Sequence, residues 1–278
     1  MYYLFILGKI IALSFPRTIS YKIAKFFALA HFHLSTKDRE AVFYNLKPLV
    51  EENQNQNKIA KKVFINFAYY LTDFFRYSRL TKKFIKKYVS FQGLDLVDKA
   101  IKEKKGAILL TAHLGNYELG GAVMSLLGYP LLVVALPHLD LRTNNFFNKQ
   151  REKAGIEVIP TGLAVKRSIS VLKEGKLLAL LGDRDFSNSG KRQKVFSRFV
   201  YIPRGAAFFA KKSKAAIIPV FFVRENKYYY RLIFEDAIIY NKNSKNLEEE
   251  ILQNYVRVLE KYLKKYSDQW YLFQKYWQ

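Results

Sequence analysis

The feature that most constrains this chain is an alternation that begins near residue 88. Short apolar runs, too brief for helices and bounded by polar residues, alternate with longer segments whose apolar residues recur at helical spacing. This pattern predicts an α/β fold in which helices flank a mixed central sheet. The predicted strands are Tyr88–Phe91, Ala107–Thr111, Leu131–Leu136, Ile156–Ile159, Leu177–Leu181, Ile217–Val223 and Tyr228–Phe234. The predicted helices are Leu94–Lys104, Tyr117–Leu127, Arg142–Ala154, Ala164–Lys173, Arg204–Lys214 and Leu247–Lys265.

The first 34 residues differ from the rest in their apolar character. As a helix, Tyr2 to Phe15 would reach about 21 Å, short of the roughly 30 Å of a bilayer core. Pro16-Arg17 follows in place of a small-residue cleavage site, which favours a retained anchor over a removed signal. From Ile19 to Leu34 the spacing predicts an in-plane amphipathic helix, with an ordinary pair of core helices as the alternative. We therefore predict a membrane-associating segment over residues 1–34 and one catalytic domain over residues 35–278.

The charge of the chain predicts a polyanionic partner. Forty-seven Lys and Arg against 23 Asp and Glu leave a formal net charge of +24, which attracts nucleic acid and anionic lipid surfaces alike. The aromatic share of 16% favours the membrane, because amphipathic rings concentrate at the bilayer interface. A compositional bias of an AT-rich genome would raise the same residues. We expect an anionic membrane surface, and no nucleic acid, as the partner.

The absence of certain residues and motifs argues against several classes of chemistry. The chain has no Cys, which excludes disulfides, thiolate metal sites and a cysteine nucleophile. The glycine-rich signatures of nucleotide and dinucleotide sites are missing, as is the serine elbow of hydrolases. His31 and His33 lie in a predicted helix without a third ligand, so we expect no metal site and no cofactor.

The segment around His113 carries the chemistry. Gly106-Ala-Ile-Leu-Leu-Thr-Ala-His113 reads as a buried strand that ends in a polar residue, and Leu-Gly-Asn116-Tyr-Glu118 follows before a helix of small residues. Active sites of open α/β sheets lie at the carboxyl ends of strands. His113 is also one of only four histidines. These observations favour a catalytic histidine over a capping or core pair of His and Glu.

The spacing of His113 and Glu118 sets a geometric requirement. On one continuous helix the five-residue offset would turn the two side chains about 140° apart. If the chain turns at Gly115 and Glu118 lies in the first helical turn, we expect the carboxylate to contact the imidazole and to fix its tautomer. The other ring nitrogen could then take a proton from a hydroxyl, as in a triad whose serine is replaced by the alcohol of the substrate.

These residues resemble a known family. His113-Leu-Gly-Asn-Tyr-Glu118 looks like the His-x-x-x-x-Glu signature of the lipid A biosynthesis acyltransferases, a branch of the glycerolipid acyltransferase superfamily. The similarity continues over nearly the whole chain, in the same order. It includes an early segment that ends in Asn-Leu, an Asp-x-Asp block, a Pro-x-Gly and a terminal Glu-Gln-Trp-like motif, found here as Arg39 to Leu46, Gly182 to Phe186, Pro203 to Gly205 and Asp268 to Phe273.

The resemblance implies a single acyltransferase domain and a transfer reaction at a membrane. It implies an acyl carrier protein thioester, or CoA, as donor and a hydroxyl of a membrane lipid as acceptor, such as a lipid A precursor, another glycolipid or a lysophospholipid. It also implies the cytoplasmic face of the bacterial inner membrane, His113 and Glu118 as the catalytic pair, and Asn116 as a substrate contact. The chain departs from the family pattern at Leu136-Pro137, Arg184 and Gln274-Lys275-Tyr276, which leaves the acceptor open.

Secondary candidates lie after the strand Leu177 to Leu181. Asp183, Arg184 and Asp185 should share the sheet edge of His113, where Arg184 could bind a phosphate; a structural Arg/Asp network is the alternative. The basic loop of residues 187–204, with Arg198 and Arg204, could hold an acidic head group or the acidic carrier protein, unless it is merely solvated. His138, at another strand end, could contact substrate or have no role.

Two other functions remain open at this stage. A nucleic-acid-binding protein would use the net charge of +24 on phosphates. A lipid hydrolase would use water in place of the acceptor alcohol. Acyl transfer is the function that the His113 segment favours most.

Overall fold

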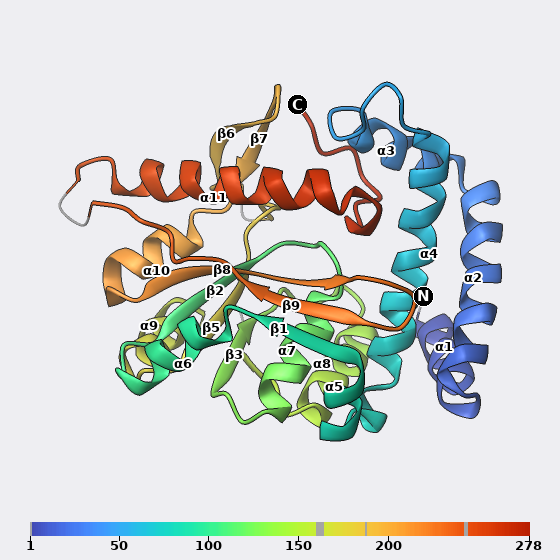
Figure 1. Ribbon diagram of the computed structural model, residues 1–278, viewed down its shortest axis with the longest axis horizontal. Helices are drawn as coiled ribbons and strands as arrows, with labels where there is room; N and C mark the ends of the chain where they lie inside the picture. Colours follow the sequence, from blue (N-terminus) through green and yellow to red (C-terminus); the bar gives the residue numbers. More distant parts are fainter. Residues whose placement is uncertain (1, 160–163, 187, 242–243) are drawn as a thin grey trace.

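A computed structural model describes residues 2–159, 164–186, 188–241 and 244–278. Its centre is a seven-stranded sheet with helices on both faces, and a group of N-terminal helices stands at one end (Figure 1). The sheet order is β1-β9-β8-β2-β5-β3-β4. The strands are β1 (Val89–Gln92), β2 (Ala107–Thr111), β3 (Leu131–Val134), β4 (Glu157–Ile159), β5 (Leu177–Leu181), β8 (Ala216–Arg224) and β9 (Tyr230–Phe234).

The sheet is mixed, as predicted. Neighbouring strands pair in parallel except β8 and β9, which are antiparallel, so β1 and β9 run against the other five strands. The alternation of side chains in β2 divides the core. Ile108 and Leu110 pack into one apolar cluster, while Ala107 and Leu109 pack into a second. Buried strands of this kind are apolar on both faces because helices cover each side.

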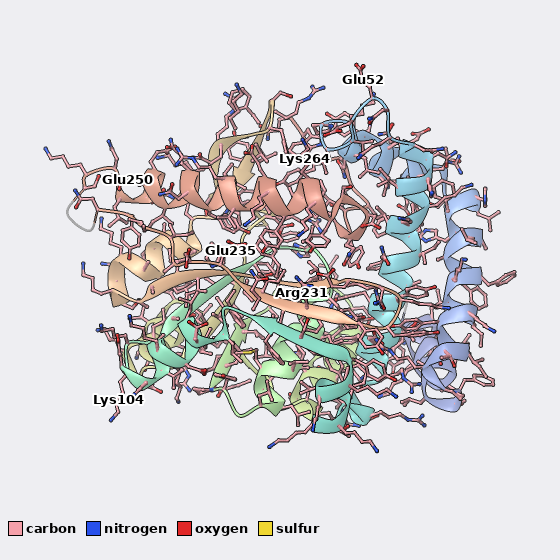
Figure 2. All side chains as sticks on the ribbon, in the orientation of Figure 1. Glu52, Lys104, Arg231, Glu235, Glu250 and Lys264 are labelled. Carbon is pink, nitrogen blue, oxygen red and sulfur yellow. The ribbon has the colours of Figure 1, made fainter. Side chains whose placement is uncertain are left out.

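Helices pack on both faces of the sheet in the part of the chain that the structure describes. One cluster contains residues of α9 (Ala164–Lys173), α10 (Gly205–Ser213) and α11 (Leu247–Lys265), and the other contains residues of α6 (Leu94–Lys102), α7 (Tyr117–Leu126) and α8 (Leu141–Lys153). Along α11, Glu250 lies in the first turn and Lys264 in the last (Figure 2). Acidic residues near the start of a helix and basic residues near its end stabilise the helix dipole.

The N-terminal region consists of α1 (Tyr2–Ser14), α2 (Arg17–Leu34), α3 (Thr36–Leu46) and α4 (Gln56–Phe75), followed by a 3₁₀ turn, η1 (Tyr77–Arg79), and α5 (Lys82–Tyr88). Residues 2–34 form two helices, which agrees with the helical spacing in the sequence. Helix α2 lies along α4 (Figure 1), and the side chain of Tyr21 is completely buried. No helix within the described residues is both long and apolar enough to cross a bilayer.

A buried ionic cluster joins α2 and α4 to the sheet. The Asp73 carboxylate of α4 accepts hydrogen bonds from Arg17 Nε (3.0 Å) and Nη2 (3.1 Å) of α2, and from the Tyr21 hydroxyl (2.5 Å). Arg224 of β8 and Tyr230 of β9 also donate to this carboxylate. The N-terminal helices are therefore fixed to the α/β region by charge as well as by packing.

The prediction of a basic loop over residues 187–204 is wrong for most of that range. Residues 191–202 form an antiparallel ribbon of β6 (Lys191–Val195) and β7 (Arg198–Ile202), and Ser187 lies outside the described residues. Gln193, Val195, Val200 and Ile202 point inward and are buried, and their neighbours are exposed. The two-residue period is hidden in the sequence because β6 has a polar residue, Gln193, on its inward face, and β7 has two aromatic residues, Phe199 and Tyr201, on its outward face.

Candidate functional site

The sheet brings His113 and Asp183 together. Strands β2 and β5 are parallel neighbours with Thr111 opposite Leu181, and each functional residue follows its strand by two positions. The carboxyl ends of parallel strands meet at one sheet edge. The prediction that Asp183 shares the edge of His113 is therefore confirmed.

Asp183 is hydrogen-bonded to both the ring and the backbone of His113. Its Oδ1 atom lies 2.8 Å from His113 Nδ1, and its Oδ2 atom accepts the backbone N–H of His113 at 3.1 Å. The indole Nε1 of Trp270 donates to the same Oδ2 atom at 3.2 Å. An ionised carboxylate accepts the proton of Nδ1, which leaves Nε2 as the basic nitrogen of a neutral imidazole.

The environment keeps Asp183 ionised. Its side chain is completely buried, and burial alone would raise its pKa. The neighbouring imidazole of His113 and the hydrogen bonds from His113 and Trp270 oppose this effect, and the pKa of Asp183 is lowered overall. Asp183 is thus a fixed negative charge beside a ring that can become positive.

The prediction that the Glu118 carboxylate contacts the His113 imidazole is wrong. The Glu118 carboxylate instead pairs with Arg151 of α8: Nη2 of Arg151 lies 2.5 Å from Oε1 and Nε lies 3.1 Å from Oε2. The predicted strand end, turn and helix start are all present, but successive helical side chains diverge by about 100°. The first-turn side chain beside the imidazole is that of Tyr117, whose ring centre lies 5.4 Å from that of His113.

Gly115 and Asn116 shape the turn between β2 and α7. Gly115 has a φ of +69°, and an added Cβ would lie 2.2 Å from the carbonyl oxygen of Phe222, so only glycine fits here. The Asn116 side chain accepts the N–H of Leu119 at 3.2 Å and caps α7. Asn116 is 1% exposed. Its environment therefore supports a capping role in place of the predicted contact with substrate.

The segment after α11 packs directly against this turn. Gly115 donates its N–H to Gln269 O at 2.8 Å, and Tyr271 donates its N–H to His113 O at 3.1 Å. The side chain of Asn45 fixes the next residues: Nδ2 donates to Leu272 O and Gln274 O, and Oδ1 accepts the N–H of Tyr276. The early Asn-Leu motif and the terminal motif therefore build one support beneath His113.

Arg184 and Asp185 lie at the outer side of the His113–Asp183 pair. The guanidinium of Arg184 stacks over the Phe186 ring at 4.7 Å, and that ring lies 6.2 Å from the imidazole of His113. Arg184 Nη2 donates to Gln274 Oε1 at 3.2 Å. Two positions that depart from the family pattern therefore contact each other. Asp185 accepts the N–H of Gly190 at 2.7 Å and so shapes its own loop.

The other predicted residues do not converge on His113. Arg204 pairs with Glu248 of α11 through Nε (2.7 Å) and Nη2 (2.9 Å), which neutralises the charge expected to hold an anion. Arg198 lies exposed on the β6–β7 ribbon. The ring of His138 packs 4.6 Å from Phe147 of α8, and its pKa is lowered by burial and by the positive charge of Arg151.

The sequence model of the family described as bacterial lipid A biosynthesis acyltransferase matches residues 1–278. The chain belongs to this family. The predicted resemblance is thereby confirmed, and the His113–Asp183 edge is the candidate active site of a lipid A biosynthesis acyltransferase family member.

Curated relatives carry related names. A "Lipid A biosynthesis acyltransferase" of Haemophilus influenzae is 26% identical over 196 residues, which cover 68% of this chain and 60% of the relative. A "Phosphatidylinositol mannoside acyltransferase" of Mycolicibacterium smegmatis is 28% identical over 46% of this chain and 45% of the relative. A "Lipid A biosynthesis palmitoleoyltransferase" of Escherichia coli is 25% identical over 53% and 49%. The matches thus span about half to three fifths of the length of these relatives.

Sequence reasoning placed Asp183 at the right edge but gave the wrong partner to His113. The two residues are 70 positions apart, and only the adjacency of β2 and β5 makes them neighbours. No local pattern in the sequence marks Arg151 as buried, and a buried arginine requires an acidic partner. Asn45 and Trp270 belong to the early and terminal motifs, and no local pattern connects them to His113.

Proposed function

We propose that this family member is a membrane-associated O-acyltransferase. It transfers a fatty acyl group from an acyl carrier protein or CoA thioester to a hydroxyl of a glycolipid such as a lipid A precursor. It acts at the cytoplasmic face of the bacterial inner membrane. The observation that carries this proposal is the His113–Asp183 pair at a sheet edge, in a chain matched over its length by a family of acyltransferases.

The geometry supports His113 as the general base. The side chain is 14% exposed, and within the described residues nothing hydrogen-bonds its Nε2 atom. Nε2 would take the proton of the acceptor hydroxyl, and that oxygen would form an ester bond to the thioester carbonyl carbon. As the carbon–sulfur bond breaks, the imidazolium would return its proton to the thiolate. The buried Asp183 carboxylate would stabilise the imidazolium during these steps.

The developing oxyanion needs a hydrogen-bond donor. We assign this role to the backbone amides of Tyr117 and Glu118, the first-turn amides of α7. Neither amide has an acceptor in the part of the chain that the structure describes. Amides at a helix start favour negative charge through both their free N–H groups and the helix dipole.

Exposed apolar residues support membrane attachment beside the site. On α1, Tyr3, Leu4, Leu7 and Ile10 are more than half exposed. The loop after β3, at the same sheet edge as His113, exposes Leu136 and Leu139. Arg142, at the start of α8, lies over the rings of Tyr2 and Tyr3, so this loop and α1 are neighbours. A bilayer that accepts these residues would lie close to the catalytic edge.

The test compares Asp183→Asn and His113→Ala with the wild-type protein. Transfer from an acyl carrier protein thioester to lipid acceptors is followed by mass spectrometry. We expect kcat to fall by about 10²–10⁴-fold in both variants. Asp185→Asn is the matched control and should retain most activity. Undiminished transfer by Asp183→Asn would refute the proposed pair, and release of free fatty acid without acylated lipid would indicate a hydrolase.

A further inference from the structure

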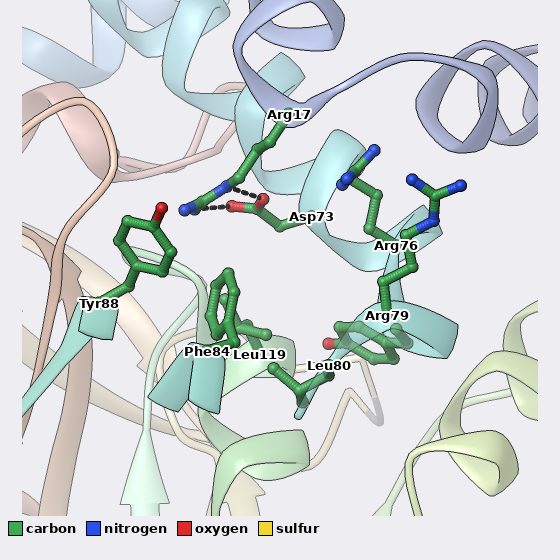
Figure 3. Close-up of a pocket in the computed structure, with 9 residues that line it drawn as sticks. Arg17, Asp73, Arg76, Arg79, Leu80, Phe84, Tyr88 and Leu119 are labelled. Carbon is green, nitrogen blue, oxygen red and sulfur yellow. Dashed lines mark hydrogen bonds and ion pairs between the residues drawn. The ribbon is translucent and has the colours of Figure 1, made fainter. Parts of the chain in front are cut away.

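A cavity separate from the His113 edge lies between the end of α4, η1, α5 and the start of α2 (Figure 3). Its volume is about 220 Å³. One side is basic and is formed by Arg17, Arg76 and Arg79, and the other is apolar and is formed by Leu80, Phe84, Tyr88 and Leu119. We call it the arginine cavity. Neither His113 nor Asp183 lines it.

The cavity carries excess positive charge. Arg17 is paired with Asp73 (Figure 3), which Arg224 shares. Arg76 and Arg79 have no carboxylate partner among the described residues. Arg76 Nη1 donates to the backbone carbonyls of Ala12 and Phe15, and Arg79 Nη2 donates to that of Leu13 at 2.6 Å.

Most donors of these two arginines remain available. A guanidinium has five N–H donors, and the hydrogen bonds of Arg76 and Arg79 to backbone carbonyls use one nitrogen of each. Burial and the neighbouring charge of Arg79 lower the pKa of Arg76. The hydroxyl of Tyr77, which also lines the cavity, is buried without a partner in the described chain. An anion would relieve the repulsion and use the unfilled donors.

The residues around the cavity add to its positive charge. Between residues 74 and 94 the chain holds Arg76, Arg79, Lys82, Lys83, Lys86 and Lys87, and no Asp or Glu. The four lysines are exposed on α5. On the other side, Phe15 and Ile19 of the α1–α2 corner are each 41% exposed. Basic clusters beside apolar membrane-facing residues attract anionic lipid head groups.

We propose that the arginine cavity binds the phosphate of an anionic phospholipid head group at the membrane surface. This inference rests on the membrane attachment proposed above. Arg76 and Arg79 donate to the phosphate oxygens, and the apolar side contacts the glycerol and the first carbons of the acyl chains. The volume is smaller than that of sites for drug-sized ligands, which suits a head group and not a whole lipid. The apolar side favours a lipid over free phosphate.

The test uses short-chain lipids below their micelle concentration and the full chain without acyl donor. Titration calorimetry measures binding of dihexanoyl phosphatidylglycerol, dihexanoyl phosphatidylcholine and inorganic phosphate. We expect saturable binding of phosphatidylglycerol, with phosphatidylcholine and inorganic phosphate each at least about tenfold weaker. Inorganic phosphate that binds as tightly as the lipid would overturn the assignment to a lipid head group.

Two variants and a control connect the binding to the cavity. The double variant Arg76→Gln/Arg79→Gln should weaken phosphatidylglycerol binding by at least about tenfold. Arg192→Gln/Arg257→Gln removes the same charge from exposed positions outside the cavity and should bind as the wild type does. Leu80→Trp fills the cavity without a change in charge and should also weaken binding, so the test survives if the double variant fails to fold.

The outcomes separate this inference from the proposed reaction. Wild-type binding by both Arg76→Gln/Arg79→Gln and Leu80→Trp would overturn the head-group site, whatever the transferase activity. A protein that binds phosphatidylglycerol through the cavity and yet transfers no acyl group would leave the site intact and would count against the proposed function alone.

Discussion

At the scale of single residues, Glu118 is the residue whose role in the structure differs most from the role predicted from the sequence. Its carboxylate and the guanidinium of Arg151 are both nearly buried, with side-chain exposures of 12% and 10%. Removal of one member of such a pair leaves an uncompensated charge in a region of low dielectric. The glutamate of the His-x-x-x-x-Glu motif therefore fixes α8 to the first turn of α7 instead of contacting the imidazole.

This role predicts a strong energetic coupling between the two residues. Glu118→Gln and Arg151→Met should each lower the free energy of unfolding by roughly 3–5 kcal/mol, and the double variant should lose much less than the sum. Urea denaturation of the four proteins measures the coupling. Additive losses would show that the pair does not act as a unit. Replacement of the exposed Glu157, which pairs with Arg167, is the control and should cost little.

How much of the structure the sequence predicts depends on the range of the interaction concerned. Strands β2 and β5 were predicted with their observed bounds because apolar runs and their polar ends are local signals. The position of Glu118 in the first helical turn was also predictable. The direction of its side chain was not, because that depends on where Arg151 of another helix lies. The partner of His113 depended on strand order, which no local pattern contains.

At the scale of elements, the Asp73 cluster connects α2 and α4 to β8. Burial would raise the pKa of Asp73, but Arg17 and Arg224 lower it below its ordinary value of 3.8. The folded state therefore holds this proton less tightly than the unfolded state does. The contribution of Asp73 to stability is complete above its unfolded pKa and is lost as the pH falls through the lower folded pKa.

Asp73→Asn should consequently destabilise the protein in a pH-dependent manner. We expect a loss of roughly 3–5 kcal/mol at pH 7, unchanged at pH 5 and smaller below about pH 4, where the wild-type carboxylate begins to lose its advantage. Urea denaturation across this range measures the difference. Asp236→Asn, at an exposed aspartate, is the control and should cost little at pH 7. A loss for Asp73→Asn that stays constant down to pH 2 would contradict the assignment.

The segment of residues 269–277 depends on Asn45 of α3. Asn45→Ala removes hydrogen bonds to Leu272, Gln274 and Tyr276 and leaves the buried carbonyl of Leu272 and two partly buried backbone groups unpaired, so we expect a loss of about 2–4 kcal/mol. Activity should fall as well, because Trp270 in this segment holds Asp183. Asn254→Ala, at a partly exposed asparagine on α11, is the control. Thermal unfolding together with kcat checks both effects.

At the scale of the whole molecule, exposed apolar residues of α1 and of the loop after β3 form one of the apolar areas on the surface. Deletion of residues 1–34 would be a poor test of membrane binding, because it would also remove Arg17 and Tyr21 from the buried Asp73 cluster. Point substitutions in the exposed set leave that cluster intact. Whether residues 1–34 act as a separate segment remains a prediction.

Leu139→Glu should weaken membrane binding. Leu139 is fully exposed, and transfer of its side chain into a bilayer is worth about 1.5–3 kcal/mol, so loss of that transfer lowers the partition coefficient by about tenfold or more. Sedimentation with phosphatidylglycerol vesicles gives the bound fraction. Ile239→Glu is the matched control, because Ile239 is 86% exposed and belongs to the segment between β9 and α11, which lies on the opposite side of the molecule from α1 (Figure 1). Equal binding by both variants would contradict the proposed orientation.

The support built by residues 269–277 also bears on how the protein is made. The turn that holds His113 is hydrogen-bonded to Gln269 and Tyr271, and Asp183 is held by Trp270. During synthesis on the ribosome, where domains fold as the chain emerges, these contacts cannot form until this late segment has left the exit tunnel. A nascent chain can thus collapse around its sheet and bring His113 and Asp183 to one edge, while the hydrogen bonds that hold the His113 turn and the Asp183 carboxylate in place are completed only after translation has passed this segment.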